Sequence, residues 1–285
     1  MPLDEDKYPA ESGRRRFVKG VVGSAALSTV GAGGAAALDT ATSSAGIGGG
    51  TTTYVAIENT AGPAPRGMPL IPLTIESGEL KGVWPEFDSE RGIVINDDFG
   101  GSGIPYSSQM LQYCGLQTAE GVYPQADQNN TFRTGSGTYA WESEYDQGVP
   151  ITVDMFDDYK EWGNGIGKDG LGKPGTGTWR SEGDVKTIPV QVLRSPEVPK
   201  IANGEGPYSS IPGPVREYFK AATEDSFMAW ANKCTHFCCV PGYKQLEGSA
   251  NYDAENKVYC QCHQSVYDPF NPVQKTMVAL PRPPQ

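Results

Sequence analysis

The chain has 285 residues, enough for one or two domains, and a formal net charge of −11. This acidity argues against a nucleic-acid-binding protein, which usually carries a basic face. The 36 glycines and 23 prolines, with few long helical patterns, favour an all-β fold with long loops.

The N-terminal part predicts an exported, membrane-anchored protein. Residues 1–16 form a polar tail that ends in a basic cluster, and Arg14-Arg15-Arg16-Phe17-Val18-Lys19 resembles the twin-arginine export motif. An ordinary secretory signal is the alternative. The apolar residues 17–38 are long enough to span a bilayer of about 30 Å. The basic residues before them predict a cytoplasmic N-terminus. A cleaved signal is the other interpretation of this segment.

Two regions of uncertain character follow. Residues 39–65 are rich in Gly, Ser and Thr and predict a flexible linker. Residues 66–180 form a loop-rich region of unknown role, in which 92–96 and 149–155 are candidate strands. Cys114 stands alone there, and we expect a free or buried thiol rather than a ligand.

The β pattern becomes clearer in residues 181–285, which we expect to form a domain of antiparallel strands. The predicted elements are strands at 188–193, 227–231, 257–259 and 277–280, with a short helix at 215–223. The second and third of these strands lead directly into cysteines.

Those cysteines belong to two short motifs, C-T-H-F-C-C at 234–239 and C-Q-C-H-Q-S-V-Y at 260–267. Together they hold five of the six cysteines and both histidines of the chain. Two thiolates and two imidazoles suit either a tetrahedral zinc site or a [2Fe–2S] cluster with Cys on one iron and His on the other.

The motif pair resembles the Rieske iron–sulfur protein of quinol-oxidising cytochrome bc-type complexes. The resemblance covers residues 234–267 and implies a Rieske-type antiparallel fold with a small cluster-binding subdomain. The implied ligands of the cluster are Cys234, Cys260, His236 and His263. The resemblance also implies a disulfide between Cys239 and Cys262, although Cys238 is an alternative partner. Ser265 and Tyr267 occupy the family's positions for hydroxyl groups that hydrogen-bond to cluster sulfurs.

The resemblance also implies a function. His263 is the ligand expected at the exposed edge of the cluster, where it would bind the quinol and accept its proton. The expected partners are a membrane cytochrome b-type subunit and an acceptor, either a cytochrome c or a blue-copper protein. The head would lie outside the cell membrane, on a single retained anchor. A Rieske subunit of another exported oxidoreductase, such as a molybdenum enzyme, and a zinc-stabilised binding module are the alternatives.

Three positions depart from the family pattern, and two proline-rich segments fit it loosely. Cys238 and Gln264 stand where the family has Gly, and Gln261 stands where it has Pro. Residues 62–65 (GPAP) look like the family's proline loop but precede the motif, so they are interpreted as linker. Residues 281–284 (PRPP) are the other candidate for that loop, or a terminal tail.

Overall fold

The computed structural model describes residues 50–90, 93–114, 116, 130–180 and 187–279, which all belong to one compact unit. It is mostly antiparallel β-sheet with few helices, in agreement with the all-β prediction. The export motif, the segment 17–38 and the prolines at 281–284 lie outside the described residues. Among the described residues, no helix is both long and apolar enough to span a membrane.

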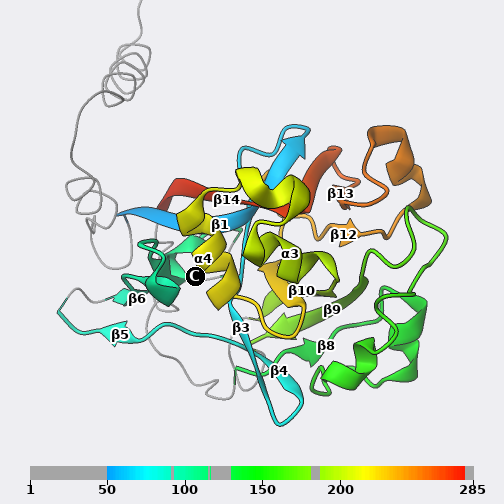
Figure 1. Ribbon diagram of the computed structural model, residues 1–285, viewed down its shortest axis with the longest axis horizontal. Coiled ribbons are helices and arrows are strands. Elements are labelled where there is room, and N and C mark those ends of the chain that lie inside the picture. The colour runs from blue at the N-terminus through cyan, green and yellow to red at the C-terminus, as the bar shows by residue number, and fades with distance from the viewer. Residues whose placement is uncertain (1–49, 91–92, 115, 117–129, 181–186, 280–285) are drawn as a thin grey trace, which may run out of the picture. The chain divides into compact units, whose positions relative to one another are not determined.

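A five-stranded sheet joins the beginning of the described chain to its end. Its strands follow the order β12-β13-β14-β1-β2, and β1 pairs with β14 from Gly50↔Ala279 to Ala61↔Val266. The two long strands lie side by side in Figure 1, one blue and one red. The bounds are β1 (Gly50–Ala61), β2 (Met68–Pro69), β12 (Gly242–Tyr243), β13 (Val258–Cys260) and β14 (Ser265–Ala279).

A four-stranded sheet of order β11-β10-β9-β8 forms the second layer. All residues of β11 are buried, and the backbone N–H of Ile71, just after β2, donates to the carbonyl of Ala229 in β11 at 2.9 Å. This bond links the two sheets. The bounds are β8 (Arg133–Thr134), β9 (Lys173–Trp179), β10 (Ile188–Arg194) and β11 (Phe227–Ala231).

Smaller elements surround the two sheets (Figure 1). A hairpin consists of β3 (Leu73–Glu76) and β4 (Glu79–Gly82), and a small sheet consists of β5 (Phe87–Asp88), β6 (Ile93–Asn96) and β7 (Tyr106–Ser107). The α-helices are α3 (Glu197–Asn203) and α4 (Gly213–Ala221). Short 3-10 helices are η2 (Phe99–Gly101), η3 (Ser108–Leu111), η5 (Ala140–Glu144), η6 (Val153–Phe156), η7 (Gly206–Ser210) and η8 (Glu247–Tyr252).

The predicted strand at 188–193, the helix at 215–223 and the strand at 227–231 are confirmed as β10, α4 and β11. The candidate strand at 92–96 is confirmed as β6, and 257–259 and 277–280 lie largely within β13 and β14. The candidate strand at 149–155 is wrong, because its second half forms η6.

The linker prediction for 39–65 is wrong over 50–61, which form β1. The threonines and the buried Tyr54, Val55 and Ile57 make this segment a good strand, because β-branched and aromatic side chains fit a half-buried sheet surface. Residues 66–180 are likewise no separable insertion. Their last strand, β9, pairs along its whole length with β10, so the predicted boundary at 180/181 cuts through one sheet.

Candidate metal centre

The first ligand loop, residues 232–241, follows β11. It is a tight loop, in which the N–H of Cys234 donates to the carbonyl of Cys239 at 2.8 Å and the N–H of Cys238 donates back to the carbonyl of Cys234 at 3.0 Å. Cys234 is buried, His236 is partly buried and Phe237 is 64% exposed. The loop therefore presents a buried thiol and an imidazole near the surface.

The second ligand loop, residues 261–264, connects β13 to β14. The strands close at Cys260↔Ser265, and the N–H of Gln264 donates to the carbonyl of Cys260 at 2.9 Å. Cys260 is buried at the end of β13, whereas Cys262 and His263 are exposed in the turn. This loop thus repeats the arrangement of a buried thiol followed by an imidazole.

Both loops contain a residue in the left-handed region, at the positions where the resembled family has glycine. Cys238 has a φ of 65° and Gln264 has a φ of 61°. The backbone conformation that glycine normally serves is therefore kept by side chains that adopt it at some cost.

The two loops bring the four predicted ligands together. The imidazole rings of His236 and His263 lie 4.8 Å apart between centroids, and the thiol of Cys260 hydrogen-bonds to that of Cys234. The shared proton with Cys260 and a hydrogen bond from Tyr267 lower the pKa of Cys234 to about 5. The pKa of Cys260 is raised, because it keeps the shared proton and because it is buried.

This donor set fits a metal group. Two thiols, one of them acidified, and two imidazoles can provide two thiolate and two nitrogen ligands. The Nδ1 atom of His236 is buried without a hydrogen-bond partner among the described residues. A buried polar atom without a partner is costly, and a metal bond would satisfy it.

A disulfide joins the two ligand loops between Cys239 and Cys262, the pair that the resemblance implies. The sulfurs of Cys239, Cys260 and Cys262 lie within 4.8 Å of one another. Since two of these sulfurs are bonded to each other, they are not thiolates, and this group does not form a metal site of its own. Its effect is to hold Cys260 beside the cross-link.

A second disulfide joins Cys114 to Cys238, so the prediction of a free or buried thiol at Cys114 is wrong. A count could have found this pair. Of six cysteines, the motifs use Cys234 and Cys260 as ligands and the resemblance pairs two more, which leaves Cys114 and Cys238. No local spacing connects them, because they lie 124 residues apart.

Two hydroxyl groups lie behind the ligands. The Tyr267 hydroxyl donates to Sγ of Cys234 at 3.2 Å and accepts from the backbone N–H of Thr235 at 3.1 Å. Ser265 is fully buried, and its Oγ accepts from the backbone N–H of Ala64 at 3.2 Å. The Ser265 hydroxyl hydrogen is not used in that bond and can donate elsewhere.

The loop 62–67 covers both ligand loops, although the sequence of residues 62–65 predicts a linker. The carbonyl of Arg66 accepts from the Thr235 hydroxyl at 2.6 Å in the first loop, and Ala64 binds Ser265 beside the second. A Cβ on Gly62 would lie 2.4 Å from the carbonyl oxygen of Gln264. Backbone contact this close needs glycine.

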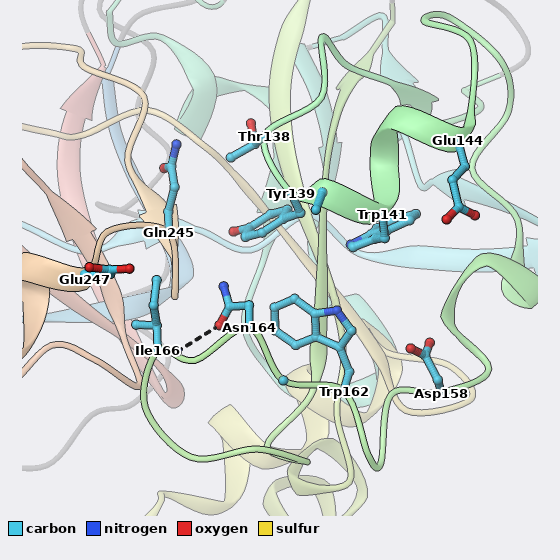
Figure 2. A pocket seen from close by; sticks show the side chains of 12 residues that line it. Thr138, Tyr139, Trp141, Glu144, Asp158, Trp162, Asn164, Ile166, Gln245 and Glu247 are labelled. Atoms are coloured by element: carbon cyan, nitrogen blue, oxygen red, sulfur yellow. Dashed lines mark hydrogen bonds between the residues drawn. The ribbon is translucent and has the colours of Figure 1, made fainter.

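A separate groove of about 680 Å³ lies between the 138–166 region and the segment after β12 (Figure 2). Its lining residues are Thr138, Tyr139, Ala140, Trp141, Glu144, Asp158, Trp162, Gly163, Asn164, Ile166, Gln245 and Glu247. The lining has no Cys or His, so the groove has no part in the donor set above.

Comparison with family models, with curated protein sequences and with solved structures finds no match to this chain.

Proposed function

We propose that this chain is a one-electron carrier of the Rieske type, which takes an electron and a proton from a quinol. The observation that carries the proposal is the convergence of two buried thiols and two imidazoles from two disulfide-linked loops, with the Tyr267 hydroxyl on Cys234. A structural zinc site has no need of a hydroxyl donor to a ligand sulfur, whereas such bonds tune the potential of iron–sulfur clusters.

In this proposal Cys234 and Cys260 hold one iron of a [2Fe–2S] cluster, and His236 and His263 hold the other. When bound, the cluster supplies a site for one electron at a potential above that of all-Cys clusters, because imidazole is a neutral ligand. The buried thiols and the fixed loops exclude water from the Cys side of the site.

His263 is the residue for contact with the quinol. Its side chain is exposed in the second loop, and the exposed ring of Phe237 lies 4.9 Å from it between centroids. An imidazole nitrogen that faces solvent can accept a hydrogen bond and then a proton from a quinol hydroxyl. The Phe237 ring adds an apolar surface against which a quinol ring can pack.

The hydrogen-bond donors favour the high-potential branch of the family. The Tyr267 hydroxyl donates to a ligand sulfur and thereby stabilises electron-rich sulfur, which favours the reduced state. The buried Ser265 hydroxyl has a hydrogen available for a cluster sulfide. We propose for the same reason a cytochrome b-type subunit as the membrane partner and a cytochrome c or blue-copper protein as the acceptor. The head would sit outside the cell membrane on the N-terminal anchor.

The experiment that tests the proposal is electron paramagnetic resonance (EPR) of the purified full-length chain after reduction with ascorbate. A rhombic signal with an average g below the free-electron value is the expected result. A signal that needs dithionite would retain the cluster and overturn the quinol-oxidising function. Zinc without iron, and no signal, would establish a zinc-binding module instead.

A further inference from the structure

The first ligand loop is bound to a part of the chain that lies outside both motifs. The segment 106–114, which contains β7 and η3, ends against this loop. Cys114 is disulfide-bonded to Cys238 with a Cα–Cα distance of 5.3 Å. The hydroxyl of the buried Tyr113 donates to the carbonyl of Lys233 at 3.1 Å, one residue before the ligand Cys234.

The same segment also contacts the loop that covers the site. The guanidinium group of Arg66 lies 5.4 Å from the centre of the Tyr113 ring, and the carbonyl of Arg66 binds the Thr235 hydroxyl. Lys233 adds a contact within the loop, because its Nζ donates to the carbonyl of Cys238 at 3.2 Å. Tyr113 and the Arg66 carbonyl therefore contact the first ligand loop from outside, and the Lys233 side chain adds a bond within it.

From these contacts we infer that the segment 106–114 supports the cluster site in addition to the two ligand loops. The Cys114–Cys238 disulfide and Tyr113 position the first ligand loop, and with it His236. This inference rests on the proposed function. It gives a role to part of the 66–180 region, which the sequence left without one.

The Cys239–Cys262 disulfide cannot do this alone. It ties the two ligand loops to each other, so both could still shift together. The second loop is a short turn between the paired strands β13 and β14, whereas the first is a longer excursion between strands of different sheets. A bond from Cys238 to a third segment fixes the loop that the sheets hold least.

Cys238 is also placed where a side chain is disfavoured. Its φ of 65° lies in the left-handed region, which is unfavourable for every residue with a Cβ. Glycine would remove that cost and would also remove the tether. The disulfide is thus the structural reason for a side chain at this position, and His236 lies only two residues away.

The segment that follows the loop, β12 and Lys244, is held by the 130–172 region. The hydroxyl of Tyr139 donates to the carbonyl of Tyr243, and the amide of Asn164 donates to the carbonyl of Lys244 at 2.7 Å. Tyr139 and Asn164 both line the groove of Figure 2, together with Gln245, the next residue of this segment. The first ligand loop is thus fixed at its side by Cys114 and at its exit by hydrogen bonds.

The test uses the double variant Cys114→Ser/Cys238→Gly of the full-length chain. It removes the tether, leaves no unpaired thiol and gives position 238 the residue that its φ favours. Two measurements are made: the rate at which a ferrous-iron chelator removes iron after ascorbate reduction, and amide hydrogen exchange of residues 234–239 in the metal-free protein. Cys239→Ser/Cys262→Ser is the matched control, because it removes the other disulfide.

We expect iron loss at least fivefold faster than in the wild type, with faster exchange in 234–239 and unchanged exchange in 261–264. A lower unfolding temperature with unchanged iron loss and unchanged exchange would overturn the inference, because the disulfide would then be only a general cross-link. If the double variant fails to fold, Tyr113→Phe decides, since it keeps both disulfides; unchanged exchange at 234–236 in that variant would overturn the positioning role.

Failure of the proposed function would look different. If the wild-type protein binds no iron, the rate of iron loss cannot be measured and the proposed electron-transfer function is refuted. The exchange measurement in the metal-free chain would still decide whether Cys114 and Tyr113 hold the first loop.

Discussion

Tyr267 donates its phenol hydrogen to Sγ of Cys234 at 3.2 Å while its oxygen accepts the backbone N–H of Thr235 at 3.1 Å. The phenol is buried, and its pKa is raised by that burial and by the bond to Cys234, so it stays protonated as a donor. A residue of β14 is thereby connected to the first ligand loop, 33 residues earlier in the chain.

We expect Tyr267→Phe to keep the cluster and to lower its reduction potential by roughly 60–120 mV. A hydrogen bond to a charged group contributes about 1.5–3 kcal/mol, and about 1.4 kcal/mol corresponds to 59 mV for one electron. A redox titration followed by EPR measures the shift. Tyr259→Phe is the control, because Tyr259 stacks on Tyr252 and its hydroxyl bonds to that residue rather than to a ligand sulfur. An unchanged potential in Tyr267→Phe would remove this residue from the tuning of the site.

Replacement of His263 separates ligation from folding. We expect His263→Ala to lose the EPR signal and quinol oxidation. The free energy of unfolding of the metal-free variant should stay within about 0.5 kcal/mol of the wild-type value, because the side chain is exposed. Gln261 is exposed in the same loop and serves as the control, because Gln261→Ala should keep both the EPR signal and quinol oxidation. A His263→Ala protein with a wild-type signal and activity would refute the ligand assignment.

Two glycines of nearly equal φ test how tightly the loop 62–67 packs on the second ligand loop. Gly62 and Gly78 have φ values of 82° and 83°, but only at Gly62 would a Cβ meet other atoms, at 2.4 Å from the Gln264 carbonyl. We expect Gly78→Ala to cost about 1–2 kcal/mol from its φ alone, and Gly62→Ala to cost about 1–3 kcal/mol more because of the clash. Urea unfolding of the two metal-free variants provides the comparison. Equal losses would mean that the loop 62–67 moves away from the second ligand loop at no cost.

Gln264 allows the reverse substitution, in which glycine replaces a side chain at positive φ. Glycine at this position relieves the cost of a φ of 61°, about 1–2 kcal/mol, but makes the unfolded chain more flexible, which offsets about 0.5–1 kcal/mol. We therefore expect Gln264→Gly to stabilise the protein by about 0.5–1 kcal/mol and Gln264→Val to destabilise it. The loss of the exposed hydrogen bond from Gln264 to Tyr252 is a small correction. Thermal unfolding of both variants measures the order, and a destabilised glycine variant would contradict it.

Asp268 makes the stability of the fold depend on pH. Burial raises its pKa above the ordinary value, Glu58 opposite it on β1 adds to the increase, and Lys257 and the N–H of Phe270 oppose it. Since the folded state then holds the proton more tightly than the unfolded state, this contribution to stability is present below the unfolded pKa of about 3.9 and is lost as the pH rises through the folded pKa. We expect Asp268→Asn to gain stability relative to the wild type at pH 7 but not at pH 3, as measured by urea unfolding at both values. Equal differences at the two pH values would exclude a shifted Asp268.

The approach of the two Cys/His loops to each other could be predicted because the pattern of each motif is local. Cys234 and His236, or Cys260 and His263, lie within a few residues of each other, and the strands that lead into them have clear patterns. The parts that could not be predicted depend on distant pairing. Nothing in the sequence around residues 51–57 indicates that their pairing partner, β14, lies more than 200 residues away. Without that partner, this Gly-rich and Thr-rich stretch has the composition of a linker. The linker prediction for residues 62–65 is wrong for the same reason, because the position of the loop 62–67 over the site follows from β1.

The pairing of β1 with β14 has a consequence for the order of events in folding. The central strand pair of the five-stranded sheet joins Gly50 to Ala279, so this sheet cannot be completed until nearly the whole chain has been synthesised. Contacts of such long sequence separation slow folding, and until then β1 exposes unpaired backbone groups on the edge that β14 later occupies. Nascent chains of this protein should therefore depend on a chaperone at β1, and a truncation that removes β14 should aggregate rather than yield a smaller folded domain.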